Sequence, residues 1–526
     1  MAASIPDIDA LSVDELKKLV LQLVEEISAL RAENAAQGEE IVRLKGLKGR
    51  PKIRPSGMEP ATDAKAAGGN ANKRRRGGAK RVVTEERLIT MAPPPGSRFK
   101  GYESYTVEDL VVRPATIRYR RERWRTAAGE TLVAPLPAEV RGHVGAELHR
   151  YVLALYHQGR MTVAGLLAHL DGLGVSLSKR QLVRLLIVDQ ERFVDEARDV
   201  LRAGLETAAW ISVDDTGARH KGANAICTQI GNDHFAWFAT TASKSRRNFL
   251  DLLRAGHADY VVNDAALAYM RARKLAGPLI ARLEACETRR FADDAAWTAH
   301  LDRLGLGGLT VTPDPVRIAT EGALWGSVLD HGFLADAVIV SDDAGQFNVG
   351  RHALCWVHAE RLIHKLDTFT DHHRRAVEGI RDRLWRFYAD LKAYRQKPSS
   401  RRKAELTRRF DALFTTRTGY VTLDRLLQRL HANKHELLAV LDRPEIPLHT
   451  NGSENDIRCQ VIRRKISAGT RSETGRQCRD GFLGLIKTCQ KLQLSFWTYL
   501  GNRLNLPDAP TVPLLPDLVR TRASPA

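Results

Sequence analysis

The stretch Ala208-Ala209-Trp210-Ile211-Ser212-Val213-Asp214-Asp215-Thr216-Gly217 places an apolar run directly before two acidic residues. The run predicts a buried β-strand at 208–213 that ends beside the acids. Strands are also predicted at 225–230 and 235–241, joined by a tight turn at Gly231-Asn232-Asp233. An amphipathic helix at 243–255 and a strand at 260–262 follow. Strands interleaved with helices predict a mixed sheet and a fold of the α/β class.

Two more acidic positions follow the same pattern farther along the chain. A predicted strand at 337–341 leads into Asp342 and Asp343, and a predicted helix at 453–463 opens with Asn451-Gly452-Ser453-Glu454. Carboxylates held on rigid, converging elements suit Mg²⁺, which prefers oxygen ligands. Two such ions about 3.5–4 Å apart stabilise the attacking and leaving oxygens of a phosphodiester displacement.

Each acid also has an interpretation that involves no metal. An aspartate after a strand is commonly a turn residue, and Glu454 could complete a capping box with Asn451 as the N-cap. Asp264 also ends a predicted strand and competes with Asp342 as the second acid. Successive strand residues point to opposite faces, so only one residue of each Asp-Asp pair is expected to line a cleft.

The composition favours a polyanionic partner. Lysine and arginine number 81 against 62 aspartates and glutamates, a net charge of +19. No apolar run reaches the roughly 20 residues of a membrane span, and the first ten residues lack a secretory signal. The six cysteines form no Cys-x-x-Cys pair and predict reduced thiols. These features predict a cytoplasmic protein without a membrane partner.

The N-terminal region shows a heptad repeat over 13–44. Branched residues with one asparagine occupy one register and mostly leucines the other, which predicts a parallel two-stranded coiled coil and a homodimer. The first register contains Val13, Val20, Ile27, Asn34 and Ile41, and the second contains Leu16, Leu23, Leu30, Gln37 and Leu44. The alternative is an amphipathic helix packed on its own chain.

A basic segment rich in Gly and Pro follows the heptads and predicts a flexible linker. It contains Arg50, Lys52 and Arg54 in a Gly-Arg-Pro context similar to minor-groove hooks. General attraction to phosphates explains the same charges without a motif.

The segment before the sheet is predicted to hold a small β module and then helices. Short strands are expected at 110–112 and 115–119. Two amphipathic segments, 161–170 and 178–186, have helix-turn-helix spacing, with Lys179, Arg180 and Arg184 available to a DNA groove. A plain helical hairpin is an equally good interpretation.

The order of motifs resembles the transposases of the insertion sequence 66 family. The resemblance covers about 11–500 and is carried by the acidic motifs above, by the segment Cys355-Trp356-Val357-His358-Ala359-Glu360-Arg361, and by the run Asn451 to Arg458 followed by Arg463-Arg464-Lys465. It implies an RNase H-like core in which Asp214, Asp342 and Glu454 are the catalytic residues and metal ligands. Arg464 and Lys465 match a basic pair expected to contact phosphate, and Arg458 is expected on the same DNA-facing helix.

The chain departs from the family pattern in three places. Asn455 stands where an arginine is usual, and Glu360 where a basic residue is usual. Residues 96–140 contain no cysteine, so thiolate zinc binding is excluded there. A different zinc site built from Cys355, His358, His352 and His364 is less favoured than ordinary packing of these side chains.

These observations predict a series of segments along the chain. In order, they are a coiled coil at 1–46, a basic disordered linker at 47–96, a β module resembling a zinc ribbon without cysteines at 97–140, a helical DNA-binding region at 141–206, a catalytic domain at 207–500 with helical insertions at about 266–335 and 367–445, and a Pro-rich tail at 501–526 that is expected to be disordered from about Pro507.

The resemblance implies a DNA transposase that uses two Mg²⁺ or Mn²⁺ ions to cut and join the ends of its mobile element. Its partners are then terminal inverted repeats and target DNA, with dimers or higher assemblies forming on DNA. Two alternatives stay open: a non-catalytic DNA-binding protein derived from such an enzyme, and an RNase H-like nuclease that cuts without joining.

Overall fold

The computed structural model describes Ser12, Asp14 and residues 83–137, 140, 143–309 and 311–523. The chain divides into two compact units, Met1–Asp109 and Leu110–Ala526. Residues 83–109 are extended and exposed, with one turn and no helix or strand among them. The predicted coiled coil at 13–44 and the basic residues Arg50, Lys52 and Arg54 lie outside the described residues.

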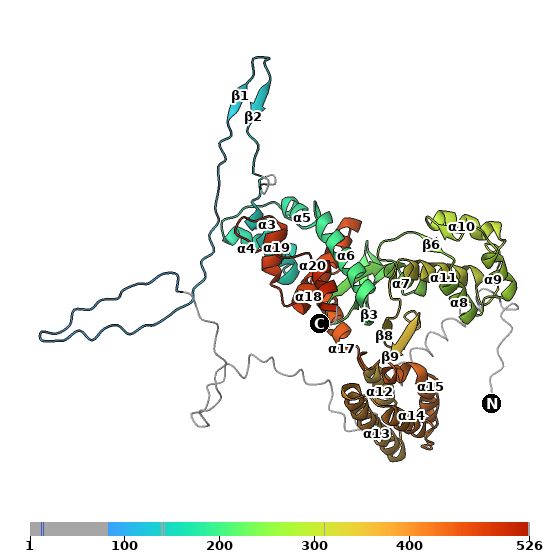
Figure 1. Cartoon of the computed structure of the whole chain (residues 1–526). Helices are drawn as coiled ribbons and strands as arrows, with labels where there is room; N and C mark the ends of the chain where they lie inside the picture. The colour runs from blue at the N-terminus through green and yellow to red at the C-terminus, as the bar shows by residue number, and fades with distance from the viewer. Residues whose placement is uncertain are drawn as a thin grey trace. The chain divides into compact units, whose positions relative to one another are not determined.

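The second unit begins with a β-hairpin. Strands β1 (Arg123–Arg125) and β2 (Thr131–Val133) pair antiparallel and lie side by side in Figure 1. The strands expected at 110–112 and 115–119 are not formed, and the prediction of strands there was wrong. The apolar side chains of those segments stay exposed (Leu110 83%, Ile117 67%), so no buried surface stabilises a strand there.

A helical region follows, as predicted. It contains a π-helical turn, η2, that continues α3. Its elements are α3 (Ala146–Leu153), η2 (Ala154–Gln158), α4 (Val163–Gly172), α5 (Lys179–Ile187) and α6 (Glu191–Thr207). A capping box between Ser178 and Gln181 starts α5. The helices α4 and α5 confirm the two predicted amphipathic segments.

A five-stranded mixed sheet forms the centre of the unit, which confirms the α/β class. Its strand order is β5-β4-β3-β8-β9: β3, β4 and β5 pair antiparallel, and β3, β8 and β9 pair parallel. The strands are β3 (Trp210–His220), β4 (Ala223–Gly231), β5 (Ala236–Thr241), β8 (Val338–Ser341) and β9 (Arg351–Leu354).

Three details of the sheet differ from the sequence-based expectation. β3 does not end at Asp214 but continues to His220, because β4 pairs with its full length. β9 was not predicted. β6 (Tyr260–Val261) pairs with β7 (Arg290–Phe291) in a separate sheet. The tight turn between β4 and β5 is confirmed by the hydrogen bond from Asn232 N to Phe235 O.

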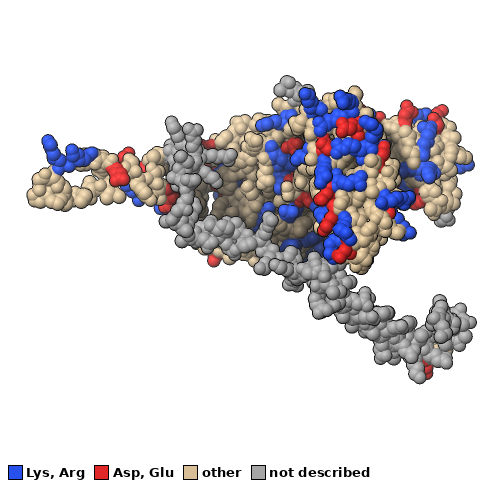
Figure 2. All heavy atoms as spheres, turned by 90° about the horizontal axis from the view of Figure 1, so that it is seen from below, with Lys and Arg blue, Asp and Glu red and all other residues tan. Residues whose placement is uncertain are grey.

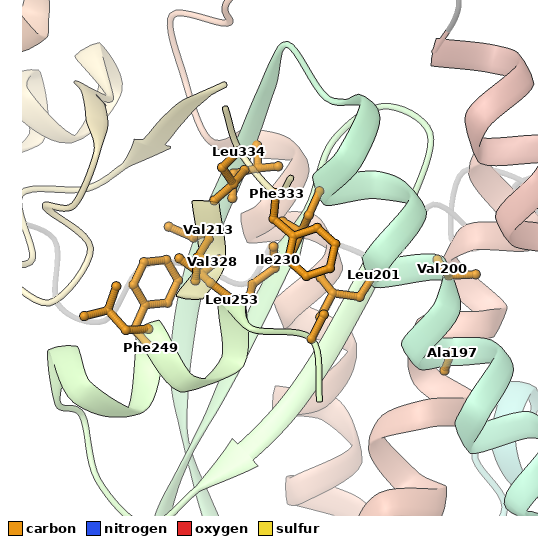
Figure 3. Close-up of a cluster of buried hydrophobic side chains, with 14 of the residues drawn as sticks. Ala197, Val200, Leu201, Val213, Ile230, Phe249, Leu253, Val328, Phe333 and Leu334 are labelled. Atoms are coloured by element: carbon orange, nitrogen blue, oxygen red, sulfur yellow. The ribbon is translucent and has the colours of Figure 1, made fainter. Parts of the chain in front are cut away.

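The sheet has two covered faces. On the α6 face, apolar residues of β3 and β4 join one large core with α6, α7 (Arg246–Leu253) and α11 (Pro315–Asp330). Figure 3 shows part of this core, including Val213, Ile230, Leu201, Phe249 and Val328. The opposite face carries Ala218 and Cys227, which pack with Ile457 of α17 (Asn451–Ser467), and is called the α17 face below.

Helical segments occupy both regions predicted as insertions. Between β6 and β8 lie α8 (Asp264–Ala272), α9 (Gly277–Glu284), α10 (Asp294–Arg303) and α11. After β9 come α12 (Trp356–His364), α13 (Asp371–Gln396), α14 (Ser400–Phe414), α15 (Val421–Ala432), α16 (Lys434–Leu437) and the short turn η3 (Ala439–Leu441). The helices α12 to α16 enclose a second core that includes Val338 and Val340 of β8.

The C-terminal helices return to the main core. They are α18 (Glu473–Lys491), α19 (Phe496–Arg503) and α20 (Leu515–Ala523). Leu515 and Val519 are buried against α6, and Glu196 of α6 bonds to Arg503 and to the backbone N–H of Leu515. The prediction of a disordered tail was therefore wrong for the described residues up to 523. Nowhere in the described ranges does a helix have the length and apolar content needed to cross a bilayer.

Candidate functional site

Asp214 and Asp342 lie level with each other on neighbouring parallel strands. Ser212 of β3 pairs in register with Val340 of β8, and each aspartate follows its strand's paired residue by two positions. Side chains two residues apart in a strand share a face. The Asp214 carboxylate is therefore directed to the face that carries Ser212 and Val340, and Asp342 follows directly after the last residue of β8 at the same edge of the sheet.

Glu454 is brought to the same face by α17. The hydroxyls of Ser212 and Ser453 are hydrogen-bonded, which fixes the first turn of α17 over β3. Ala218 lies four residues after Asp214 in β3, so the two side chains share a face of the sheet, and Ala218 packs with Ile457 of that helix. Glu454, the residue after Ser453, thus stands beside the two aspartates although it follows Asp214 by 240 positions.

The electrostatics of Asp214 reflect this convergence. Burial raises the pKa of its carboxyl to about 6, and the nearby negative charges of Asp342, Asp215 and Glu454 add to the rise. The backbone N–H of Asp215 donates a hydrogen bond to Asp214 Oδ1 over 2.8 Å, and this bond lowers the pKa and partly offsets the rise. Neither Asp214 nor Asp342 forms an ion pair with a described residue, so their negative charge is uncompensated within that part of the chain.

Glu454 is held by two side chains of α12. Its Oε1 lies 3.4 Å from His358 Nε2 and 3.5 Å from an Arg361 guanidinium nitrogen. The capping box considered for Glu454 is not formed. The N-cap of α17 is Thr450 rather than Asn451, and no side chain caps this helix. The Glu454 side chain therefore does not cap the helix, and its contacts are with His358 and Arg361 of α12.

Behind Glu454, Cys355 and His358 form a polarised pair. Burial opposes ionisation of Cys355, yet hydrogen bonds from His358 and Thr450 lower the pKa of the thiol below its usual range. The hydrogen bond to Cys355 raises the pKa of His358, with a smaller contribution from Glu454. Thr450 N lies 3.4 Å from the Cys355 sulfur. This set ties the start of α12 to the start of α17.

The competing acidic residues have other environments. Asp215 is directed to the α6 face, where Lys244 Nζ and Gln346 Nε2 bond its two oxygens at 3.0 and 2.8 Å. Asp343 pairs with Arg429 of α15. Asp264 begins α8 after β6, outside the five-stranded sheet.

The three carboxylates offer hard oxygen ligands, a donor set that suits Mg²⁺ or Mn²⁺, and only Glu454 among them pairs with a described arginine. Their oxygens do not form a group within 4.8 Å of one another among the described residues. The described group that does so is His257, Asp259 and His331. However, Asp259 already pairs with Arg290. The two imidazole rings stack with their centroids 3.6 Å apart, so the nitrogen lone pairs lie in nearly parallel planes and do not converge on one ion.

A pocket of about 450 Å³ is lined by Asp342 and its neighbour Asp343. Its wall combines the end of β8 with α12 and α15. Among its lining residues are Asp342, Cys355, His358, Arg361, Lys365 and Arg429. Basic side chains around a carboxylate site provide partners for a phosphate-containing ligand.

The basic residues proposed from the sequence fall into two described places. Lys179, Arg180 and Arg184 are exposed on α5. Arg458 and Lys465 are exposed on α17, whereas Arg464 is partly buried and donates to the carbonyl oxygen of Gly217 in β3. Arg464 therefore has a structural contact that the sequence did not predict.

Sequence reasoning also missed the partners of the acids. The Cys-Trp-Val-His motif was noted, but its contact with Glu454 was not, because 96 to 99 positions separate the two in the chain. Glu360, which departs from the usual basic residue, is buried and bonds to Arg381 of α13 over 2.5 Å. The Lys244 and Gln346 contacts with Asp215 had no signal in the sequence.

Comparison with known proteins identifies the family of the chain. The model of the IS66 transposase family matches residues 326–478, which include Asp342, the Cys355 to Arg361 segment and Glu454. An uncharacterized protein of Sinorhizobium fredii, y4jO, is 52% identical over 315 residues, covering 60% of this chain and 98% of the relative. The acidic positions, the motif between them and the family match lead to one assignment: the chain belongs to the IS66 transposase family.

Proposed function

We propose that this protein is a DNA transposase that cuts the ends of its mobile element and joins them to target DNA, with Asp214, Asp342 and Glu454 as catalytic residues. The observation that carries the proposal is the register of β3 and β8, which sets Asp214 level with Asp342 on the face covered by the first turn of α17. The strand order, three antiparallel strands followed by two parallel ones, supports an RNase H-like core.

In this proposal the three acids act as ligands for two Mg²⁺ or Mn²⁺ ions. When bound, the ions stabilise the attacking and leaving oxygens of an in-line displacement at phosphorus. Asp214 and Asp342, which have no cationic partner among described residues, hold ions from the sheet. Glu454 completes the ligand set from α17 and is oriented by His358 and Arg361.

The reaction has two displacements of the same geometry. Water attacks a phosphorus at the element's end, a new P–O bond forms, the P–O3′ bond breaks, and the strand leaves as a 3′-hydroxyl. That hydroxyl then attacks a phosphorus in target DNA and displaces another 3′-oxygen. Each step exchanges one phosphodiester bond for another or for a phosphate end, so no covalent bond to the protein is required.

DNA binding is assigned to exposed basic side chains on two helices. Arg458 and Lys465 on α17 lie on the helix that carries Glu454, where they can contact phosphates next to the scissile bond. Lys179, Arg180 and Arg184 of α5 follow the turn after α4, in the position of a recognition helix. The N-terminal heptads and the basic residues Arg50, Lys52 and Arg54, outside the described residues, are proposed to provide dimerisation and additional phosphate contacts.

The direct test compares the full chain with Asp214→Ala on DNA carrying the ends of the element. The expected result is Mg²⁺-dependent nicking and joining by the unmodified chain, and loss of both with end binding retained in the variant. Full cleavage by Asp214→Ala would contradict the assignment. Products that are cut but never joined indicate the nuclease alternative, and binding without any cleavage indicates the non-catalytic one.

A further inference from the structure

The hairpin of β1 and β2 places arginines on one face and Trp124 with Leu132 on the other. Arg123 and Arg125 pair with Val133 and Thr131, whereas Trp124 pairs with Leu132 on the other side. The ladder extends by the bond from Ala134 N to Glu122 O, so Arg121 joins the arginine side by alternation. Arg121, Arg123 and Arg125 are called the arginine row below, and all three are exposed.

The arginines of this ribbon are exposed and have no acidic partner among the described residues. None of the arginine row, nor Arg118 or Arg120 just before it, forms an ion pair with a described residue. The folded helices, in contrast, carry many paired arginines, such as Arg409 with Asp390 and Arg503 with Glu196. Figure 2 shows lysines and arginines interspersed with acidic side chains on the face it presents. An unpaired row of cations in one short ribbon therefore indicates an external polyanion.

The ribbon is connected to the helices proposed to bind DNA. Pro114, near the start of the hairpin segment, lies close enough to Gly174 that a side chain added at Gly174 would touch it. Gly174 has a φ of +82° in the turn between α4 and α5. The base of the ribbon thus adjoins the turn that presents Lys179 and Arg180 at the start of α5.

We propose that the arginine row binds the phosphate backbone of duplex DNA, as a contact that is separate from the α5 and α17 contacts. Arginine donates up to five hydrogen bonds and suits phosphate oxygens, and a two-stranded ribbon is narrow enough to enter a major groove. The hairpin contains no cysteine and its outer side chains are exposed, so this contact needs no metal. The identity of the partner as DNA rests on the proposed function.

The test measures how the affinity of the full chain for a duplex of arbitrary sequence changes with salt, in the presence of EDTA. The substitution combines Arg121→Gln, Arg123→Gln and Arg125→Gln. Each lost phosphate contact lowers the slope of log affinity against log salt by about 0.9, so the triple variant is expected to lose about 2 to 3 of the slope. Its affinity near physiological salt falls at least about tenfold.

The matched control replaces the same three residues by lysine. Lysine retains the charge but cannot reproduce the bond from Arg121 Nε to Ala134 O. If the lysine variant keeps the salt slope of the unmodified chain, the loss in the glutamine variant results from the missing charge and not from a distorted hairpin. An unchanged slope and affinity in the glutamine variant overturns the proposal. A change in the mass of the free protein with unchanged DNA binding also overturns it, because the row then contacts a second copy of the chain. If the unmodified chain fails to bind the duplex, the proposed function fails with it.

Discussion

On the α6 face of the sheet, Asp215 is neutralised by Lys244 at 3.0 Å and hydrogen-bonded by Gln346 at 2.8 Å. On the α17 face, the preceding residue Asp214 has no cationic partner among described residues and is surrounded by Asp342 and Glu454. Two adjacent residues therefore differ in their surroundings: the Asp215 carboxylate has a cationic partner and a hydrogen-bond donor, whereas the Asp214 carboxylate lies near other negative charges. An Asp-Asp pair is thus divided by strand parity into a structural member and a member available to a cation.

The largest effect on activity is expected from substituting Asp342, the acidic residue that follows β8. We expect Asp342→Asn to lower Mg²⁺-dependent cleavage at least about a thousandfold, because a neutral amide replaces an anionic ion ligand. Asp343→Asn is the matched control. Its carboxylate pairs with the exposed Arg429, so the expected change is only a few-fold.

The measurement is single-turnover cleavage of end DNA by the two variants in parallel. Equal losses in both variants would contradict the assignment of Asp342, rather than Asp343, as the ion ligand. Asp264→Asn extends the comparison. Asp264 lies outside the five-stranded sheet, so this variant is expected to cleave nearly as fast as the unmodified chain.

The second prediction concerns the orientation of Glu454. We expect His358→Ala to lower cleavage about 10- to 100-fold, the range usual for residues that orient metal ligands. His358 contacts Glu454 at 3.4 Å, so its loss is expected to raise the Mg²⁺ concentration needed for half-maximal cleavage. DNA binding in EDTA is expected to be unchanged.

The control for His358 is a substitution in the same helix that lies away from Glu454. His364→Ala, at the end of α12, serves this purpose. A fall in maximal cleavage without any change in metal dependence would mean that His358 only stabilises the fold around Cys355.

The main features of the sheet were predictable because they depend on local patterns. The apolar runs at 208–213 and 337–341 identified β3 and β8 with the acids beside them, and the turn at Gly231-Asn232-Asp233 identified β4 and β5. The end of β3 was not predictable. Its residues after Asp214 are polar or small, and they form a strand only because β4 supplies hydrogen bonds along the whole length.

The errors in the N- and C-terminal parts have a different origin. Segments 110–112 and 115–119 have strand-like residues but no partner surface, so propensity alone did not produce strands. The region after Pro507 has turn-like composition, yet Leu515 and Val519 bury themselves against α6. In the first case the absence of a packing surface left strand-like residues without a strand, and in the second case burial ordered a segment of turn-like composition. A single sequence does not reveal burial between distant segments.

The smallest expected effect is on the stability of the fold, and it again compares Asp214 with Asp215. The pKa of Asp214 is raised from 3.8 to about 6, so between these pH values the folded state binds more protons than the unfolded state. Stability then falls as pH rises through this window, and the cost is fully present above about pH 6. Asn cannot ionise, so Asp214→Asn is expected to stabilise the metal-free protein by about 1–3 kcal/mol at pH 8 and by little at pH 4.

Asp215→Asn is expected to change stability in the opposite direction at pH 8, because it leaves Lys244 without its acidic partner on the α6 face. The measurement is the thermal unfolding midpoint of both variants at pH 4 and pH 8, with EDTA and then with Mg²⁺. Mg²⁺ is expected to raise the midpoint of the unmodified chain and of Asp215→Asn, but to raise that of Asp214→Asn much less, because ion binding to the folded state requires the Asp214 carboxylate. A destabilised Asp214→Asn at pH 8 would show that this carboxylate is satisfied by the fold, and the distinction between the two faces of the sheet would fail.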